Sequence, residues 1–450
     1  MNTQSQFHPA RRRRSGPLPG VRRLLAVLAT AGLLAACGSS TKVSSGTTTT
    51  AAGSGALTAG NTASAPGVTP TTVTVGQIAD ISQPVTGLFK SAQVGVEAYF
   101  DYINSQGGVY GRKLVLDSHD SLFQQPVVTA ASNEIAKNDL AFVGNYTLLD
   151  PAVKPVVDAN AVPNIGSPIG TALAADPNTY DPAPSTDEIA DLGPFQWFKE
   201  KFPQAIKHTA ILYAAASPSA TETYGVLKSE LGDLGYQIVY ARGFGAFETT
   251  FPADVVHMKS LGVQFFWFDG PANYAATIAK EFALQNFNPI DYEVAGYGSN
   301  LVQLGGSAVN GMYLPLASAL FLGQDARTTP IVATFDKWMN QVDGTDPIAS
   351  WGASSWASAD LFVQALKAAG RNPTRASLVA ALNHITSFNA HGLVPTSNPA
   401  QDIPSPCWLL AQVKNGVIQR VPPSPVSGFI CNPGGQLKLP GYSPVQRPAG

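Results

Sequence analysis

The strongest constraint on the fold is a regular alternation of two kinds of segment that begins near Thr71. Short, nearly continuous apolar runs alternate with stretches of helical periodicity, at intervals of about 25 residues. Uninterrupted apolar runs are typical of parallel strands that are covered on both faces, and the helices between them supply the crossover connections. The alternation therefore predicts an α/β protein with parallel sheets flanked by helices.

The alternation occurs as two successive sets, followed by a different C-terminal part. The predicted strands are residues 73–79, 114–116, 140–144 and 162–166 in the first set, and 209–214, 236–241, 264–268, 292–295 and 312–317 in the second. The predicted helices are residues 91–105, 126–137, 153–159, 188–201, 221–234, 253–261 and 272–285. Two such sets in a chain of 450 residues predict two lobes, each with its own core.

The C-terminal part adds helices and one hairpin. Helical periodicity marks residues 331–341, 356–369 and 375–384. Apolar runs at 408–413 and 417–421 flank Asn415-Gly416. We expect a two-residue type I′ turn there, because Asn and Gly adopt the positive φ angles that this turn requires.

The N-terminus has the features of an export signal. A cluster of arginines precedes an apolar stretch from residue 24 to residue 36, which is too short for a bilayer span of about 20 residues. The stretch ends in Leu34-Ala35-Ala36-Cys37, which resembles the bacterial lipobox, in which the Cys is lipidated and becomes the mature N-terminus. The alternative is an ordinary signal peptide in which Cys37 occurs by chance.

We therefore predict a signal peptide at residues 1–36 and a lipid on Cys37. Residues 37–70 are dominated by Ser, Thr, Gly and Ala, which cannot bury enough apolar surface to fold, and we expect them to form a flexible tether. The protein would then be anchored to the outer face of the cytoplasmic membrane.

Several short motifs, in the right order, resemble one known family. Gly107-Gly108-Val109-Tyr110-Gly111-Arg112-Lys113-Leu114 looks like the Gly-Gly-x-x-Gly-Arg-x-Leu of the type I periplasmic binding proteins, which include the branched-chain amino-acid-binding components of ABC importers. Phe142-Val143-Gly144, Val162-Pro163-Asn164-Ile165-Gly166-Ser167 and Thr223-Tyr224-Gly225 resemble further stretches of that family. The similarity covers roughly residues 71–421.

The resemblance implies two Rossmann-like lobes joined by a three-segment hinge, with a small molecule bound between them. It assigns residues 71–190 and about 318–395 to lobe 1, residues 191–317 and about 396–435 to lobe 2, and residues 436–450 to a Pro/Gly-rich tail. The implied function is that of a monomeric solute-binding lipoprotein that serves an ABC permease and its ATPase. Two alternatives stay open: a sensor or scaffold of the same fold, and a hydrolase using Asp80 and Asp269.

Candidate ligand-binding residues follow the predicted strands, because the carboxyl ends of strands form the binding crevice of an open α/β sheet. Most are uncharged hydrogen-bonding groups or aromatic rings, as a small-ligand pocket needs. They are Ser82, Gln83, Asn145, Tyr146, Thr147, Ser167, Tyr213, Tyr224, Asp269, Asn273 and Tyr297. The alternative for each polar residue is a cap or turn role, which Ser, Thr, Asn and Asp commonly fill.

One departure from the family bears on the ligand. Amino-acid-binding members usually carry an acidic residue after the fourth strand of the second lobe, where it can pair with the ligand ammonium. Here the stretch from Gly296 to Asn300 contains no acid, and a buried ammonium without a partner is costly. The departure therefore argues against a standard α-amino acid as the ligand. Two alternatives stay open: Asp269 takes the place of the missing acid, or the ligand is uncharged, aromatic or amide-bearing.

Other classes of function find little support. A net charge of −2 gives no electrostatic reason to expect nucleic acid as a partner. The chain has no G-x-S-x-G, His-Glu-x-x-His, Cys-x-x-Cys or P-loop motif, so we expect no catalysis, metal or cofactor. Of its 3 cysteines, Cys407 and Cys431 are expected to form a disulfide if the protein is exported; otherwise they are two unpaired thiols.

Overall fold

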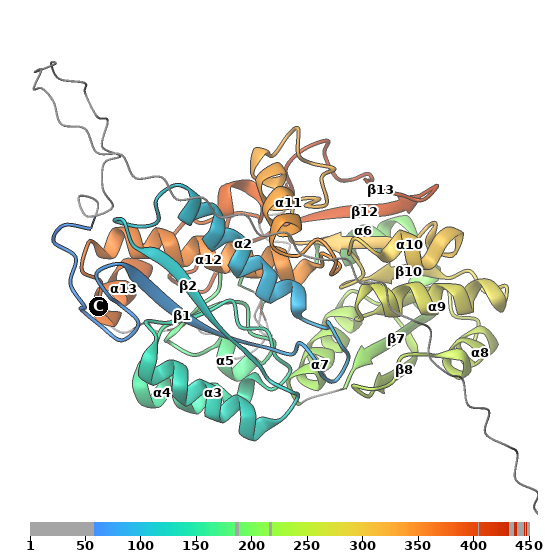
Figure 1. The fold of residues 1–450 in the computed structure, drawn as a ribbon. Helices are drawn as coiled ribbons and strands as arrows, with labels where there is room; N and C mark the ends of the chain where they lie inside the picture. Colours follow the sequence, from blue (N-terminus) through green and yellow to red (C-terminus); the bar gives the residue numbers. More distant parts are fainter. Residues whose placement is uncertain are drawn as a thin grey trace, which may run out of the picture. The chain divides into compact units, whose positions relative to one another are not determined.

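Two separate sheets, each built mainly of parallel strands, organise the fold (Figure 1). The computed structural model describes residues 58–184, 189–215, 218–403, 405–431, 436–438, 445 and 447. The predicted signal peptide, Cys37 and most of the predicted tether lie outside the described residues. The described residues belong to one structural unit, which contains both sheets.

The first sheet has the strand order β2-β1-β3-β4-β5, and all its neighbouring strands run parallel. Its strands are β1 (Thr72–Ala79), β2 (Lys113–Asp120), β3 (Phe142–Val143), β4 (Asn164–Ile165) and β5 (Thr179–Tyr180). Its flanking helices are α2 (Lys90–Ser105), α3 (Gln125–Asn138), α4 (Lys154–Asn160), α5 (Thr171–Ala174), α11 (Pro330–Val342), α12 (Ser350–Ala369) and α13 (Arg375–Leu382). We call this body lobe 1.

Alternation along β1 divides the core of lobe 1 between two faces. Val73 and Val75 pack into the cluster that includes residues of α2 and α12, whereas Ile78 packs with α3 and α4 on the other face. Figure 1 shows α2 beside α12 on one side of β1 and β2, and α3 and α4 on the other. A parallel sheet covered in this way requires apolar side chains on both faces, which is why β1 reads as a nearly unbroken apolar run.

The Gly-Gly-x-x-Gly-Arg motif has a structural role in lobe 1. Arg112 is buried and donates hydrogen bonds to the backbone oxygens of Thr69, Arg371 and Thr62. It thereby ties the start of β2 to the segment after α12. Gly108 is required at its position because its φ is +72° and a Cβ there would collide with the Arg112 carbonyl oxygen.

The second sheet has the order β13-β12-β11-β10-β9-β7-β8, with β14 paired to β12. Its strands are β7 (Thr209–Ala214), β8 (Ile238–Phe244), β9 (Phe265–Phe268), β10 (Ile290–Glu293), β11 (Tyr313–Leu316), β12 (Cys407–Lys414), β13 (Val417–Arg420) and β14 (Ile430–Cys431). The first five run parallel, and β12 and β13 are antiparallel additions. Its helices are α6 (Gly193–Lys201), α7 (Pro218–Asp233), α8 (Pro252–Ser260), α9 (Ala272–Leu284) and α10 (Leu301–Gly305).

The second sheet and its helices form lobe 2, and this sheet is also covered on both faces. Along β9, Phe265 and Trp267 pack into the cluster that contains α6 and α7 residues, whereas Phe266 and Phe268 pack with α8 and α9. Four consecutive aromatic residues can all be buried only in a strand that is covered on both sides.

The chain passes between the two lobes three times, after β5, after β11 and after α13. The helices α11 and α12 return to lobe 1, where both pack on α2, and the chain then crosses back to form β12 and β13 in lobe 2. The predicted fold class, two Rossmann-like lobes with a three-segment hinge, is confirmed. The predicted lobe boundaries stay predictions.

The second crossing is fixed by a buried ion pair. Asp325 lies in this segment, accepts a hydrogen bond from Leu320 N at 2.8 Å and is paired with the Arg420 guanidinium of β13. Both side chains are less than a tenth exposed. The pair therefore joins the second crossing to the hairpin that follows the third crossing.

Some predicted boundaries were wrong for local reasons. The helix predicted at 188–201 begins only at Gly193, where Pro194 occupies the first turn, and the short strand β6 (Ile189–Asp191) precedes it. The helix predicted at 356–369 begins at Ser350. Within the runs at 140–144 and 162–166, only two residues each pair as β3 and β4.

Part of the predicted C-terminal tail makes defined contacts. Strand β15 (Gln436–Lys438) pairs antiparallel with β6. The Arg447 guanidinium lies 4.3 Å from the centre of the Tyr180 ring, and it donates to the carbonyl oxygens of Pro177 and Pro399, each at 3.1 Å. This segment therefore lies against lobe 1 at residue 447.

The C-terminal hairpin and disulfide agree with prediction. Asn415 and Gly416, between β12 and β13, have φ angles of 51° and 74°, as a type I′ turn requires. Cys407 and Cys431 form a disulfide that joins β12 to β14.

Replacing both Cys407 and Cys431 by Ser should lower the free energy of unfolding by about 3 kcal/mol, because the disulfide closes a loop with a sequence separation of 24 residues in the unfolded chain. Urea denaturation of the variant and of the wild type would measure the difference. Wild type treated with a reductant should unfold at the same urea concentration as the variant. Equal midpoints for the oxidised wild type and the variant would show that the bridge contributes nothing.

Candidate functional site

Two adjoining cavities lie at the carboxyl ends of strands from both lobes. The first, which we call the aromatic cavity, has a volume of about 270 Å³. The second, which we call the neighbouring cavity, has about 320 Å³ and shares Val85, Leu88, Pro271 and Trp351 with the first. Both cavities are therefore lined by loops at the carboxyl ends of strands, which is where open α/β sheets bind ligands.

The lobe 1 wall of the aromatic cavity is a cluster of three aromatic rings. Phe89 immediately precedes α2, Tyr146 follows β3, and Trp351 is the second residue of α12. Their ring centroids are 5.0 to 5.3 Å apart, in tilted and edge-to-face arrangements. Such contacts hold the rings in place, so this wall is preformed before any ligand enters.

The lobe 2 wall comes from the ends of β7, β8, β9 and β10. It comprises Ala214, Phe244, Ala246, Asp269, Gly270, Pro271, Tyr274 and Ala295. Gly270 is needed because a Cβ at this position would lie 2.3 Å from the Phe268 ring. The wall is mostly apolar, and Asp269 is the one carboxyl group among the described residues that line it.

The Asp269 carboxylate has no hydrogen-bond partner among the described residues. Burial raises its pKa to about 6. Glu293, fully buried on β10, also has a raised pKa, because of burial and because of the charges of Asp291 and Asp269. Among the described residues, no cation is paired with Asp269 or Glu293 at this end of lobe 2.

The lobe 1 loops are held by carboxylates beneath them. Asp120 accepts hydrogen bonds from the backbone N–H groups of Ile81 and Ser82. Asp80 accepts from the N–H of Leu148 at 2.8 Å, and burial raises its pKa. These three N–H groups after β1 and β3 are therefore already bonded within the protein.

The same holds for the loop after β4. Asp150 accepts from the N–H groups of Ile169 at 2.8 Å and Gly170 at 2.6 Å. The Ser167 hydroxyl donates to Asp181 at 2.7 Å, and burial raises the pKa of Asp181 to about 7. Burial, and then the charge of Asp181, raise the pKa of the Tyr146 phenol.

Five of the predicted site residues line the two cavities. Tyr146, Ser167 and Asp269 line the aromatic cavity. Ser82 and Asn273 line the neighbouring cavity. That these side chains bind ligand remains a prediction.

Asn145 and Thr147 are placed differently from the prediction. Asn145 accepts a hydrogen bond from Ile78 N at 2.8 Å and donates to Asn164 at 3.2 Å, and the Thr147 hydroxyl donates to Asp80 at 2.7 Å. Both are buried, and both border a void of about 10 Å³, which has room for one water molecule at most. Their positions fit a structural role that keeps the strand ends in register.

Tyr297 was wrongly predicted to face the cleft. It is fully buried, its hydroxyl donates to Gln324 at 2.8 Å and accepts from Leu322 N at 3.2 Å, and its ring packs on Phe321. It therefore supports the second crossing between the lobes. Its position in a loop could not reveal this, because a Tyr that follows a strand can point either into the cleft or into the protein core.

Three other predicted residues also line neither cavity. Tyr213 and Tyr224 stack on each other with ring centroids 3.9 Å apart and pack on the α6 and α7 side of the sheet. Tyr213 follows Leu212, which packs on the opposite face, so strand alternation turns the Tyr213 ring away from α8 and α9. Gln83 is exposed and precedes a cis peptide bond to Pro84.

Apart from Tyr146, the aromatic rings that line this cavity were not predicted from the sequence. Phe89 and Trp351 lie at the starts of two helices, and Phe244 and Tyr274 are partly committed to the core cluster of lobe 2. No local pattern distinguishes such rings from ordinary core residues. The juxtaposition of residues 89, 146 and 351 arises only when α12 packs on α2.

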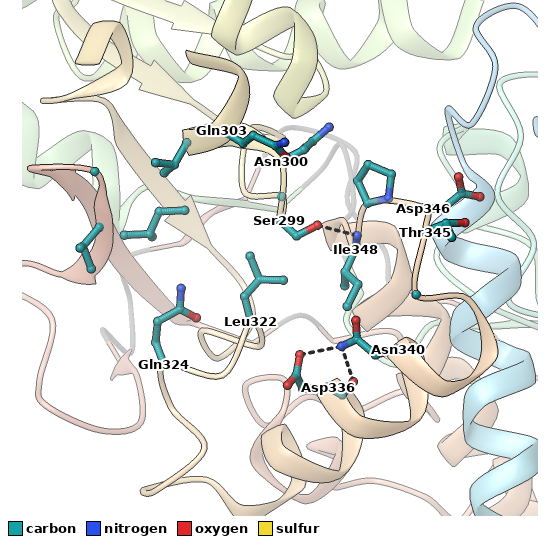
Figure 2. A pocket seen from close by; sticks show the side chains of 17 residues that line it. Ser299, Asn300, Gln303, Leu322, Gln324, Asp336, Asn340, Thr345, Asp346 and Ile348 are labelled. Carbon is teal, nitrogen blue, oxygen red and sulfur yellow. Dashed lines mark hydrogen bonds between the residues drawn. The ribbon is translucent and has the colours of Figure 1, made fainter. Parts of the chain in front are cut away.

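A third, larger cavity of about 470 Å³ lies elsewhere, between α10, α11 and the β13 end of the hairpin (Figure 2). Its wall is largely polar and exposed. Ile348 N donates to Ser299 Oγ at 2.9 Å, and the Asn340 amide donates to Asp336 at 3.1 Å. No aromatic ring lines it among the described residues. We regard the aromatic cavity as the better candidate because both lobes build it from strand ends.

Comparison with known proteins agrees with this placement. A family model for periplasmic binding proteins matches residues 72–417, which is most of the chain. The chain belongs to this family. No curated protein matches it in sequence.

Solved structures show that this periplasmic binding protein has the expected fold. A fatty acid ABC transporter substrate-binding protein from Thermomonospora curvata shares 18% identity, with a TM-score of 0.71, over 86% of this chain and 98% of that one. A branched-chain amino acid ABC transporter protein from Thermus thermophilus with bound valine shares 16% identity, with a TM-score of 0.68, over 80% and 97%. A leucine-binding protein from Thermotoga maritima shares 16%, with a TM-score of 0.64, over 78% and 97%.

The described residues contain neither a membrane-spanning helix nor a cluster of metal ligands. No helix there is long and apolar enough to cross a bilayer. No group of three or more His, Cys, Asp or Glu side chains in that part of the chain is arranged to hold a metal ion.

Replacing Asp269 by Asn should stabilise this periplasmic binding protein near neutral pH. Burial raises the pKa of Asp269 from 3.8 to about 6, so the folded state binds this proton more tightly than the unfolded chain does. Stability is therefore lost as the pH rises from about 4 to about 6 and stays lost above it. We expect Asp269→Asn to raise the free energy of unfolding by about 1–2 kcal/mol at neutral pH and by little near pH 4.

Urea denaturation at about pH 4 and about pH 7.5 would check this. Asp233→Asn, at an exposed position on α7, is the matched control and should change stability little at either pH. A stability gain from Asp269→Asn that is the same at both pH values would contradict the assignment of the effect to this carboxyl group.

Proposed function

We propose that the protein is an extracytoplasmic solute-binding lipoprotein that captures a small molecule between its lobes and delivers it to an ABC permease and ATPase. The observation that carries the proposal is the aromatic cavity, whose walls come from strand ends of both sheets. A solute in this position contacts both lobes at once. It therefore binds most tightly to the arrangement in which the lobes lie closest together.

The connections between the lobes support such a movement. Three segments cross between the sheets, and hinge closure of two lobes around a ligand is a common binding movement. A ligand shifts such an equilibrium only by its difference in affinity for the two states. Contacts from Trp351 and Tyr146 on one side and Asp269 and Tyr274 on the other would provide that difference.

The family and its relatives support the transport role. Periplasmic binding proteins are binding components outside the cytoplasmic membrane, and structures with the same fold come from ABC transporters. We propose the same role for this chain, namely delivery of its solute to a permease. A sensor or scaffold that signals to a membrane partner is the second candidate, and it would use the same cavity.

A carboxylate hydrolase has weaker support. Asp80 is fully buried, and its carboxylate accepts hydrogen bonds from Ser121, Thr147 and Leu148. It lies beneath the loops and does not line the aromatic cavity, whereas Asp269 does. The two carboxylates do not share an accessible site, as a general acid and base would need to.

Solute capture predicts stabilisation by one class of small molecule. A thermal-shift screen of residues 52–450 would use amino acids, amides, amines, sugars and aromatic acids. A ligand at 100 times its dissociation constant adds about 2.7 kcal/mol of stability. Trp351→Ala should abolish the shift, whereas Trp338→Ala, at a partly exposed Trp on α11 away from both cavities, should retain it. The proposal fails if no class raises the melting temperature.

The lipid anchor predicts a change of location. Cys37 stands outside the described residues, so only its sequence context supports this part of the proposal. Cys37→Ser should move the protein out of the membrane fraction and prevent labelling by a radioactive fatty acid. Ser40→Ala, three positions along, is the control and should stay in the membrane fraction. Membrane retention of Cys37→Ser with normal labelling would overturn the anchor.

A further inference from the structure

We propose that the aromatic cavity binds a protonated amine carried on a compact apolar or aromatic body, with Asp269 as its counter-ion. This inference rests on the function proposed above and names the class of solute. It comes from three properties that the described residues give the cavity. These are its size and aromatic wall, its one carboxylate without a hydrogen-bond partner, and the use of several lobe 1 loop donors by carboxyl groups of the protein.

The size and wall favour a small molecule with an apolar body. A volume of about 270 Å³ is near the lower end for small-molecule sites, so a single ring with a short side chain would fill much of it. Phe89, Tyr146 and Trp351 provide one side, and Phe244 and Tyr274 belong to the other. Aromatic faces attract apolar groups and, through the ring quadrupole, also cations.

The charge of the cavity is one-sided. Asp269 is the only charged side chain in the wall that the described residues form, and no Lys, Arg or His is part of it. The part of the chain that the structure describes donates no hydrogen bond to this carboxylate. An ionised group in such surroundings is costly unless it is paired, and an ammonium on the ligand supplies the missing partner.

A carboxylate ligand finds little to bind on the lobe 1 side. The N–H groups after β1 are bonded to Asp120, that of Leu148 to Asp80, and those of Ile169 and Gly170 to Asp150. The Ser167 hydroxyl donates to Asp181. These N–H groups and this hydroxyl are therefore occupied by carboxyl groups of the protein itself and are not free to bind an anion.

One cation lies close by, and the test must account for it. Lys90 lines the neighbouring cavity, where its ammonium donates to Gln93 at 2.8 Å. A zwitterion could place its ammonium near Asp269 and its carboxylate toward Lys90. If the aromatic cavity alone selects the ligand, a simple amine binds better than the amino acid with the same ring.

The experiment compares four molecules with the same phenyl ring by calorimetric titration of residues 52–450 at about pH 7.5. The probes are 2-phenylethylamine, 2-phenylethanol, 3-phenylpropanoic acid and phenylalanine. We expect the amine to bind at least about tenfold more tightly than each of the others. Its affinity should also fall as the pH is lowered below about 6, because the proton on Asp269 then competes with the ammonium.

Three variants isolate the carboxylate. Asp269→Asn should weaken binding of the amine by about tenfold or more, and leave binding of the alcohol nearly unchanged. Asp269→Glu keeps the charge and should retain the preference for the amine over the alcohol. Asp233→Asn, exposed on α7, is the matched control and should bind the amine as the wild type does. Urea denaturation of each variant verifies that it is folded.

Two kinds of result separate this inference from the function on which it rests. Tighter binding of the acid, the alcohol or phenylalanine than of the amine overturns the amine assignment and leaves solute capture standing. Unchanged affinity of Asp269→Asn for the amine also overturns the amine assignment alone. So does a thermal-shift screen in which a sugar or an acid stabilises the protein and no amine does. Failure of all classes in the thermal-shift screen overturns solute capture itself.

Discussion

Parallel pairing of strands within each sheet is the constraint on which the candidate site depends. Because neighbouring strands run the same way, every loop that follows β1, β3 and β4 emerges at one edge of lobe 1, and every loop that follows β7, β8, β9 and β10 emerges at one edge of lobe 2. The three crossings then set these edges against a shared cavity. Loops that are far apart in the sequence are thereby brought together in space.

Three carboxylates of the protein itself, two of them buried, are hydrogen-bond partners of the lobe 1 loops. Asp80, Asp120 and Asp150 satisfy backbone N–H groups that would otherwise be open to solvent or to an anion. This arrangement makes the loops rigid, because each carboxylate accepts from more than one donor. It also gives the cavity a negative environment, since the wall itself contains no cation among the described residues.

Much of the fold follows from local sequence. The run Phe265–Phe268 could only be a strand buried on both faces, and Asn415-Gly416 could only favour a tight hairpin turn. Where prediction failed, tertiary contacts decided. β6 pairs with a segment from the far end of the chain, and the Tyr297 ring enters the core because the second crossing folds over it. Neither effect leaves a periodic signal near the residue concerned.

The sequence by itself determined the α/β class, the two lobes, the order of strands along the chain and the loops in which Tyr146, Ser167 and Asp269 lie. It could do so because apolar periodicity and turn residues act over a few neighbouring positions. Only the tertiary structure decided that Phe89 and Trp351 lie beside Tyr146, and that Asn145 and Thr147 bond within the protein. It also decided that no described residue donates a hydrogen bond to Asp269. These properties depend on the direction of each side chain and on helices packed from distant parts of the chain, which no local pattern specifies.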